Sequence, residues 1–183
     1  MFRSLTVVLV LASFVSAQPF LNFPTPSNST AKPSSVYIEE GVGIAGVTIG
    51  QSTMSDVVAA YGDKYKLIEH NEYSFEIRYA DLGLAFWYCR KDREKKIFCI
   101  EVKSPCFGVT SKGLVIGEST TADVVRIYGE PEANFGGAYQ YKGIQFYYES
   151  EPQQEEGTPE PPSKIISVDI VPPDKAYSFC DGA

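Results

Sequence analysis

Alternating apolar and polar residues occur in two stretches of each half of the chain, and this period of two predicts β-strands. The stretches are 82–88 and 96–102 in the first half, and 142–148 and 164–170 in the second. One face of these strands is apolar and is expected to cover a helix: Phe86, Tyr88, Phe98, Ile100 and Val102, then Phe146, Tyr148, Ile166, Val168 and Ile170. The opposite face carries Trp87, Cys89, Cys99 and Glu101, matched by Tyr147, Glu149, Ser167 and Asp169.

Ahead of each strand pair, a short block has the pattern of a capped helix. Thr53 and Thr120 stand at the N-cap position, and an aspartate, Asp56 or Asp123, follows three residues later. A carboxylate there can accept a hydrogen bond from the free amides at the start of the helix. A glycine then stands where helices commonly end. We therefore interpret the two aspartates as helix caps rather than as a pair of acidic catalysts.

The two helix blocks belong to an internal repeat. Residues 41–62 and 108–129 share 12 of 22 positions, and the similarity continues, with changes in length, into the strands. The sequence predicts an α+β fold of two tandem copies, each a short helix plus an antiparallel β-hairpin or meander. The copies are residues 41–106 and 107–183, and the second includes an acidic loop and a C-terminal tail.

The start of the chain has the pattern of a secretory signal peptide, with Arg3, an apolar run over 5–15 and small residues after it. Residues 1–17 are therefore predicted to be a signal peptide, and the protein to be extracellular, or periplasmic in a bacterium. Residues 18–40, rich in Pro, Ser, Thr and Asn, are predicted to be a flexible leader. Export from a eukaryotic cell would make Asn28 a glycosylation acceptor. No later apolar run is long enough to span a membrane.

Export also affects how the four cysteines are interpreted, because exported cysteines form disulfides more often than metal sites. The alternation places Cys89 and Cys99 on the same face of one strand pair, and we expect them to form a disulfide. Cys106 would then pair with Cys180 and tie the tail to the junction between the copies. Four cysteines allow three connectivities, and this one is favoured by the face assignment.

The charge distribution argues against nucleic acid as a partner and suggests a contact between copies of the chain. Without the predicted signal peptide, 15 basic residues face 23 acidic ones, a net charge of −8, whereas nucleic-acid binding needs a basic surface. The loop 90–96 carries five basic and two acidic residues, and the loop 149–163 carries five glutamates and no basic residue. Hairpin tips of opposite sign could support a salt-sensitive self-association.

No pattern typical of catalysis, a cofactor or a metal site occurs in the sequence. The single histidine, His70, lies beside Glu69 and Glu72 and has too few partners for zinc binding or general-base catalysis. Glu101 and Asp169, at equivalent outer positions, are one of several carboxylate pairs that glycoside hydrolysis could use, although charged outer faces of strands are the interpretation we favour. We predict no enzyme, no catalytic or metal-binding residue and no cofactor.

Outward aromatic residues are the candidate partner-binding residues: Trp87, Tyr147, Tyr139 and Tyr141. Such side chains can stack against a protein or glycan partner, or they can be covered as a second core layer, for example by the tail. We predict a non-catalytic protein-binding module that uses the outer sheet face of both copies. The alternatives are a structural component of an extracellular matrix, wall or mineralised layer, suggested by 12 tyrosines and the acidic balance, and a secreted hydrolase.

The helix blocks and their strands resemble a known group of proteins. The pattern begins with Ile-Gly, continues with a Ser/Thr-capped helix that has Asp-Val at its third and fourth positions, and ends with a Gly that Pro follows two residues later. It is similar to the repeat of β-lactamase-inhibitor-like proteins and of SmpA/OmlA-type outer-membrane assembly lipoproteins. The likeness covers about residues 46–102 and 113–172. It implies an α+β fold and protein binding on an exposed sheet face. Neither lactamase inhibition nor membrane assembly is carried over, because no lipid-anchor cysteine and no inhibitory loop can be matched.

Overall fold

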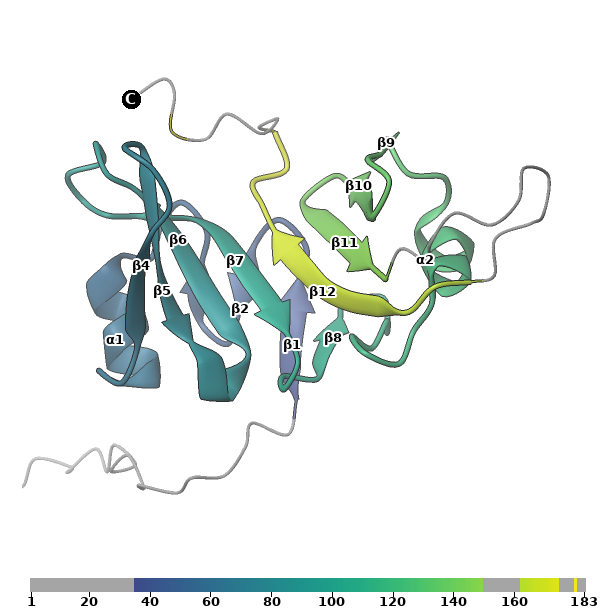
Figure 1. Cartoon of the computed structure of the whole chain (residues 1–183), viewed down its shortest axis with the longest axis horizontal. Coiled ribbons are helices and arrows are strands. Elements are labelled where there is room, and N and C mark those ends of the chain that lie inside the picture. The colour runs from purple at the N-terminus through teal and green to yellow at the C-terminus, as the bar shows by residue number, and fades with distance from the viewer. Residues whose placement is uncertain (1–34, 150–161, 175–179, 181–183) are drawn as a thin grey trace, which may run out of the picture. The chain divides into compact units, whose positions relative to one another are not determined.

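The computed structural model describes residues 35–149, 162–174 and 180. These residues form an α+β fold with two helices and two β-sheets (Figure 1). Within them, none of the helices is both long and apolar enough to cross a membrane. The predicted signal peptide, Asn28 and most of the acidic loop lie outside the described residues.

The helices and strands are short. The helices are α1 (Met54–Tyr61) and α2 (Thr121–Tyr128), with a 3-10 turn, η1 (Ala80–Leu82). The strands of the large sheet are β4 (Lys66–Glu69), β5 (Ser74–Tyr79), β6 (Leu84–Cys89), β7 (Ile97–Lys103), β9 (Ala133–Asn134), β10 (Ala138–Tyr141), β11 (Ile144–Tyr148) and β12 (Ile165–Ile170). Those of the small sheet are β1 (Val36–Glu39), β2 (Gly43–Ile44), β3 (Val47–Thr48) and β8 (Gly108–Thr110).

The large sheet consists of two meanders joined edge to edge. Its strand order is β4-β5-β6-β7-β12-β11-β10-β9, and all its neighbours are antiparallel. The junction is the β7–β12 pair at the centre of the sheet (Figure 1). There Val102 lies opposite Val168, and Glu101 lies opposite Asp169. The small sheet has the order β3-β2-β1-β8.

Both helices begin with a capping box, as predicted. The Asp56 carboxylate accepts a hydrogen bond from the Thr53 N–H at 2.8 Å, and the Thr53 hydroxyl accepts one from the Asp56 N–H. Asp123 and Thr120 make the same exchange, with the first bond at 3.0 Å. The glycine after each helix has a positive φ, 88° and 84°, which side chains with a Cβ rarely adopt.

A tyrosine from the sheet fixes the end of each helix. The Tyr79 hydroxyl donates to the Gly62 carbonyl and the Tyr141 hydroxyl donates to the Gly129 carbonyl, both at 2.7 Å. Each tyrosine ring also makes an edge contact with a phenylalanine of the large sheet. These contacts hold both helices against one face of the sheet, where the core lies. We call the opposite face the outer face.

Two predicted core positions are wrong by one residue, because the β6–β7 and β11–β12 hairpins each contain a β-bulge. The pairing register shifts within β6–β7 and within β11–β12. Ile97 and Ile165 are therefore buried, with 0% and 1% exposure, whereas the predicted Phe98 is only partly buried and Ile166 is 43% exposed. An extra residue in one strand moves its neighbours to the other face. The other predicted core positions on these strands belong to or pack against the core.

The predicted flexible leader is wrong at its C-terminal end, where β1 forms. This strand pairs antiparallel with β2 and parallel with β8. Val36 and Ile38 are buried, because their apolar side chains alternate with polar ones and face the core. The packing is close: a Cβ added to Gly108 would lie 2.6 Å from the Ile38 side chain.

The predicted disulfide pairing is also wrong. The structure contains a Cys89–Cys180 disulfide, and Cys99 and Cys106 are unpaired and buried. Cys99 lies opposite Trp87 rather than opposite Cys89. Two cysteines on the same face of a hairpin therefore do not necessarily form a disulfide, because the bond also requires a short distance between their Cα atoms. The bridge instead connects the end of β6 to the tail across 91 residues of sequence.

Replacing Thr53 or Thr120 by Ala should lower the free energy of unfolding by about 1 kcal/mol each, because an amide of the first helical turn loses its acceptor. Urea denaturation measures the change. Thr53→Ser and Thr120→Ser keep the hydroxyl and serve as controls. Equal losses with Ser and Ala would show that the hydroxyl does not stabilise the helix.

Peptide mapping without reduction should recover one linked pair of peptides, containing Cys89 and Cys180. Cys99 and Cys106 should react with an alkylating agent only after unfolding, because both are buried. Mass spectrometry identifies the linked and alkylated peptides. A peptide linking Cys89 to Cys99 would contradict the structure.

Candidate functional site

A row of side chains crosses the outer face at the junction of the two meanders. Arg78 of β5 pairs with Ala85 of β6, which pairs with Glu101 of β7. Glu101 in turn lies opposite Asp169 of β12, and Asp169 lies opposite Gln145 of β11. Residues directly opposite on neighbouring antiparallel strands share a face. The register therefore brings charged residues from distant parts of the sequence together.

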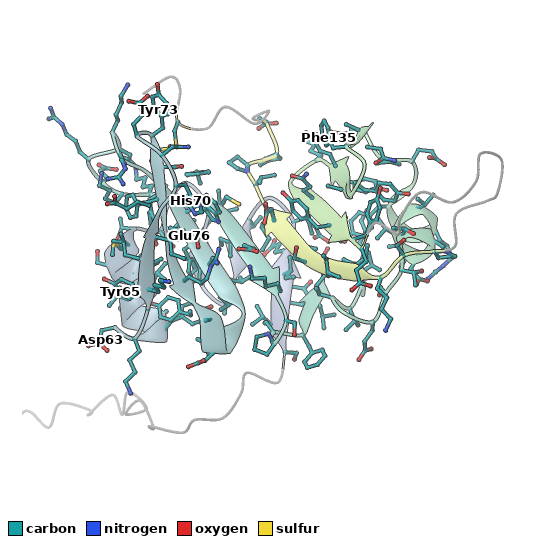
Figure 2. The ribbon with its side chains drawn as sticks, viewed as in Figure 1. Asp63, Tyr65, His70, Tyr73, Glu76 and Phe135 are labelled. Atoms are coloured by element: carbon teal, nitrogen blue, oxygen red, sulfur yellow. A yellow bond between two sulfur atoms is a disulfide. The ribbon has the colours of Figure 1, made fainter. Side chains whose placement is uncertain are left out.

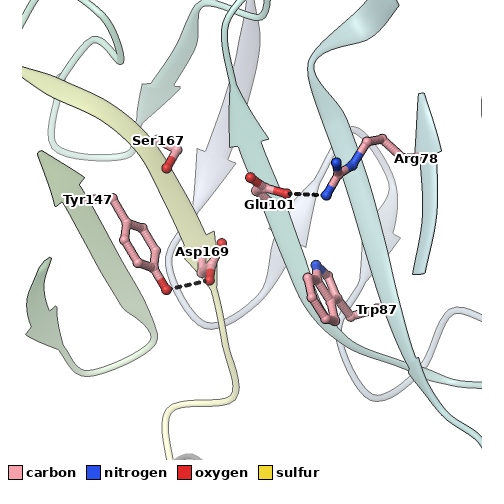
Figure 3. Close-up of a pocket in the computed structure, with 6 residues that line it drawn as sticks. All are labelled: Arg78, Trp87, Glu101, Tyr147, Ser167 and Asp169. Carbon is pink, nitrogen blue, oxygen red and sulfur yellow. Dashed lines mark hydrogen bonds and ion pairs between the residues drawn. The ribbon is translucent and has the colours of Figure 1, made fainter. Parts of the chain in front are cut away.

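A pocket of about 260 Å³ opens in this region of the outer face (Figure 3). Its lining comes from β5, β6, β7, β11 and β12, so the pocket spans the β7–β12 junction. The lining residues are Arg78, Trp87, Glu101, Tyr147, Ser167 and Asp169. The pocket thus combines two aromatic side chains, two carboxyl groups, one guanidinium and one hydroxyl.

Glu76, next to the pocket, is a buried carboxylate with 0% side-chain exposure. It lies 2.5 Å from Arg78 Nη2 and 3.3 Å from His70 Nε2. The side chains of His70 and Glu76 are labelled in Figure 2. Neither carboxylate oxygen receives a well-directed hydrogen bond, so the nearby guanidinium is the main compensation for the buried charge. Arg78 also lies 3.7 Å from Glu101.

Glu101 and Asp169 differ in their partners although they are neighbours. Lys103 Nζ donates to Glu101 at 2.6 Å. Asp169 instead accepts a hydrogen bond from the Tyr147 hydroxyl at 2.9 Å (Figure 3). Desolvation by burial raises the pKa of Asp169 to about 7; the Tyr147 hydrogen bond lowers the pKa, and the charge of Glu101 raises it. Asp169 therefore titrates near neutral pH.

Trp87 and His70 form one wall of the site. The two rings stack with centroids 4.1 Å apart and planes 19° from parallel. Trp87 lies opposite Glu76 on the neighbouring strand, so the histidine contacts both members of this pair. Neither contact of His70 could be predicted from its sequence neighbours Glu69 and Glu72, because both depend on the register of β5 with β6.

Two of the four predicted partner-binding residues reach the pocket. Trp87 and Tyr147 both line it, whereas Tyr139 and Tyr141 do not. Tyr141 is buried, and Tyr139 packs against the core. Their assignment to the outer face is wrong, because the tight turn between β10 and β11 pairs Tyr139 with the core residue Phe146.

The outer face shows no arrangement for a resident metal ion. Within the part of the chain that the structure describes, no group of three or more His, Cys, Asp or Glu side chains could hold one. The chain matches no protein-family model, and no curated protein and no solved structure matches it either.

Replacing Asp169 by Asn should stabilise the protein at alkaline pH. The folded state raises the pKa of this carboxyl from 3.8 to about 7 and so holds the proton more tightly than the unfolded state. Raising the pH from about 4 to about 8 then removes stability from the natural chain but not from the variant. We expect a gain of about 2 kcal/mol at pH 8, about half of what the full shift corresponds to, because solvent and Lys103 offset the rest.

Urea denaturation across this pH range measures the effect. Asp174→Asn is the matched control, because the Asp174 side chain is 85% exposed. Its stability should follow the pH dependence of the natural chain. The same pH dependence in Asp169→Asn would contradict the assignment of the titration to Asp169.

Proposed function

We propose that the chain is a secreted, non-catalytic protein-binding module whose partner contacts the outer face around the pocket. The observation that carries this proposal is the position of Trp87 and Tyr147, which line the same pocket from the two halves of the sheet. Aromatic side chains surrounded by polar groups are frequent centres of protein interfaces. We therefore keep Trp87 and Tyr147 as the proposed partner-binding residues.

We further propose that the two halves, residues 41–106 and 107–183, are tandem copies of one unit. Matched local structure supports this: each half has a capping box, a tyrosine bound to the glycine after its helix, and a bulged hairpin. Each N-cap also forms an equivalent bridge, Thr53 with Lys96 and Thr120 with Lys164. A likeness to β-lactamase-inhibitor-like and SmpA/OmlA-type repeats is part of this proposal, supported by the helix blocks and by the broad sheet face.

Export is also part of the proposal. The Cys89–Cys180 disulfide supports it, because disulfides persist in oxidising compartments. Cys99 and Cys106 are compatible with such a compartment because burial protects their thiols. Self-association through the charged hairpin tips stays a prediction, because most of loop 149–163 lies outside the described residues.

A secreted hydrolase is the second candidate, favoured by the adjacent carboxyl groups of Glu101 and Asp169. A raised pKa of one carboxyl beside a second carboxylate is typical of an acid and its partner in glycoside hydrolysis. Binding remains the better proposal, because Glu101 is already engaged by Lys103 and Arg78 and is poorly placed as a nucleophile. A hydrolase screen of the oxidised protein, with Asp169→Asn as the inactive control, tests this candidate.

Replacing Trp87 or Tyr147 by Ala should weaken partner binding by at least about tenfold, as expected for central interface residues. The natural chain would first be used for affinity capture from its own extracellular fraction, and binding of the captured protein would then be measured. Thermal unfolding checks that each variant is folded.

Tyr37→Ala is the matched control, because Tyr37 is 62% exposed and belongs to the small sheet. A partner that binds the Tyr37 variant but not the Trp87 variant supports the proposal. Unchanged binding by folded Trp87→Ala and Tyr147→Ala proteins would overturn it.

A further inference from the structure

The charged groups around the pocket are not all paired. Glu76 lies beside Arg78, and Glu101 lies beside Lys103. Asp169 forms no ion pair with any of the described residues, and its hydrogen bond comes from a neutral hydroxyl. The site thus holds three carboxyl groups and two basic side chains, and Asp169 is the carboxyl group that has no basic partner within the described residues.

The charge of Lys103 lowers the pKa of Asp169. The Lys103 ammonium donates its hydrogen bond to Glu101, however, and forms no ion pair with Asp169. His70 contacts Glu76 and stacks on Trp87. Burial raises the pKa of the Cys99 thiol, so this group stays neutral. Tyr147 is already the hydrogen-bond donor to Asp169. An added cation would therefore complete the charge balance of the ionised site.

We propose that the pocket binds the guanidinium group of an arginine side chain presented by the protein partner. This inference rests on the proposed function, because it names the chemistry that the partner brings to the same site. The two carboxyl groups lie directly opposite each other on neighbouring strands, and both line the pocket. They can together accept hydrogen bonds from one planar guanidinium.

The remaining pocket walls also suit this ligand. The indole of Trp87 is the best aromatic surface for a cation, and a guanidinium stacks on such a ring more readily than an ammonium does. The Ser167 side chain adds a hydroxyl to the lining. The volume of about 260 Å³ is open on the outer face and leaves room for a side chain to enter.

Binding of the cation should release a proton from Asp169. The bound guanidinium favours the carboxylate, whereas the empty site favours the carboxylic acid because of desolvation. Affinity should therefore rise with pH through neutrality and level off once Asp169 is ionised in the free protein. The same coupling should be absent when residue 169 cannot ionise.

The fluorescence of Trp87, the single tryptophan of the chain, reports directly on the pocket. Titration of the oxidised protein with N-acetyl-arginine amide should give a saturable change at pH 8. The affinity should be at least about fivefold weaker at pH 5.5, where Asp169 is protonated. N-acetyl-citrulline amide, which has a similar shape and no charge, should bind at least about tenfold more weakly.

Asp169→Asn should lower the affinity for N-acetyl-arginine amide at pH 8 by at least about fivefold and remove its pH dependence. Circular dichroism confirms that this variant is folded. Glu94→Gln is the matched control, because this side chain is 64% exposed on the hairpin loop, and its titration should equal that of the natural chain. N-acetyl-lysine amide should bind more weakly than the arginine probe.

Three results would overturn the arginine assignment: no saturable change, equal binding of the citrulline probe, or equal binding of the lysine probe. They would leave the proposed function standing if Trp87→Ala still lost the captured partner. Conversely, arginine binding by the natural chain together with full partner binding by Trp87→Ala would remove the proposed interface and keep the cation site.

Discussion

The pairing of β7 with β12 is the interaction on which the rest of the structure depends. It joins two four-stranded meanders into one sheet and buries apolar side chains on the core side of the junction. Four of them have 0% exposure: Ile100, Val102, Val168 and Ile170. Burial of each contributes about 1.5–3 kcal/mol, whereas like charges directly opposite on neighbouring strands cost only roughly 0.2–1 kcal/mol. The core side therefore sets the register, and Glu101 and Asp169 are brought together as a consequence.

The placement of Glu101 opposite Asp169 accounts for the charges of the outer face. Glu101 is compensated by Lys103 on its own strand and by Arg78 across β6. Asp169 belongs to the other half. Among the residues that the structure describes, its side chain is bonded by the hydroxyl of Tyr147 on the adjoining strand and forms no ion pair. Its pKa is raised because the junction removes the carboxyl from water, and the charge of Lys103 offsets this desolvation only in part. A site of this kind exists only when both halves are folded together.

Much of the local structure followed from the sequence. The capping boxes, the glycine stops and most of the core face could be predicted, because each depends on residues within a few positions of one another. Trp87 and Tyr147 were also identified as outward residues by alternation alone. The bulges at Phe98 and Ile166 were missed, since an extra residue leaves the apolar pattern of these strands nearly unchanged.

The sequence by itself determined two capped helices, alternating strands and an outward aromatic on each half. Tertiary structure decided which strands meet, and with that the pocket, the role of His70 and the Cys89–Cys180 pairing. The physical reason is the range of the interactions. Caps and alternation act over a few residues, whereas the register of β7 with β12 and the position of Cys180 depend on contacts between segments far apart in the chain.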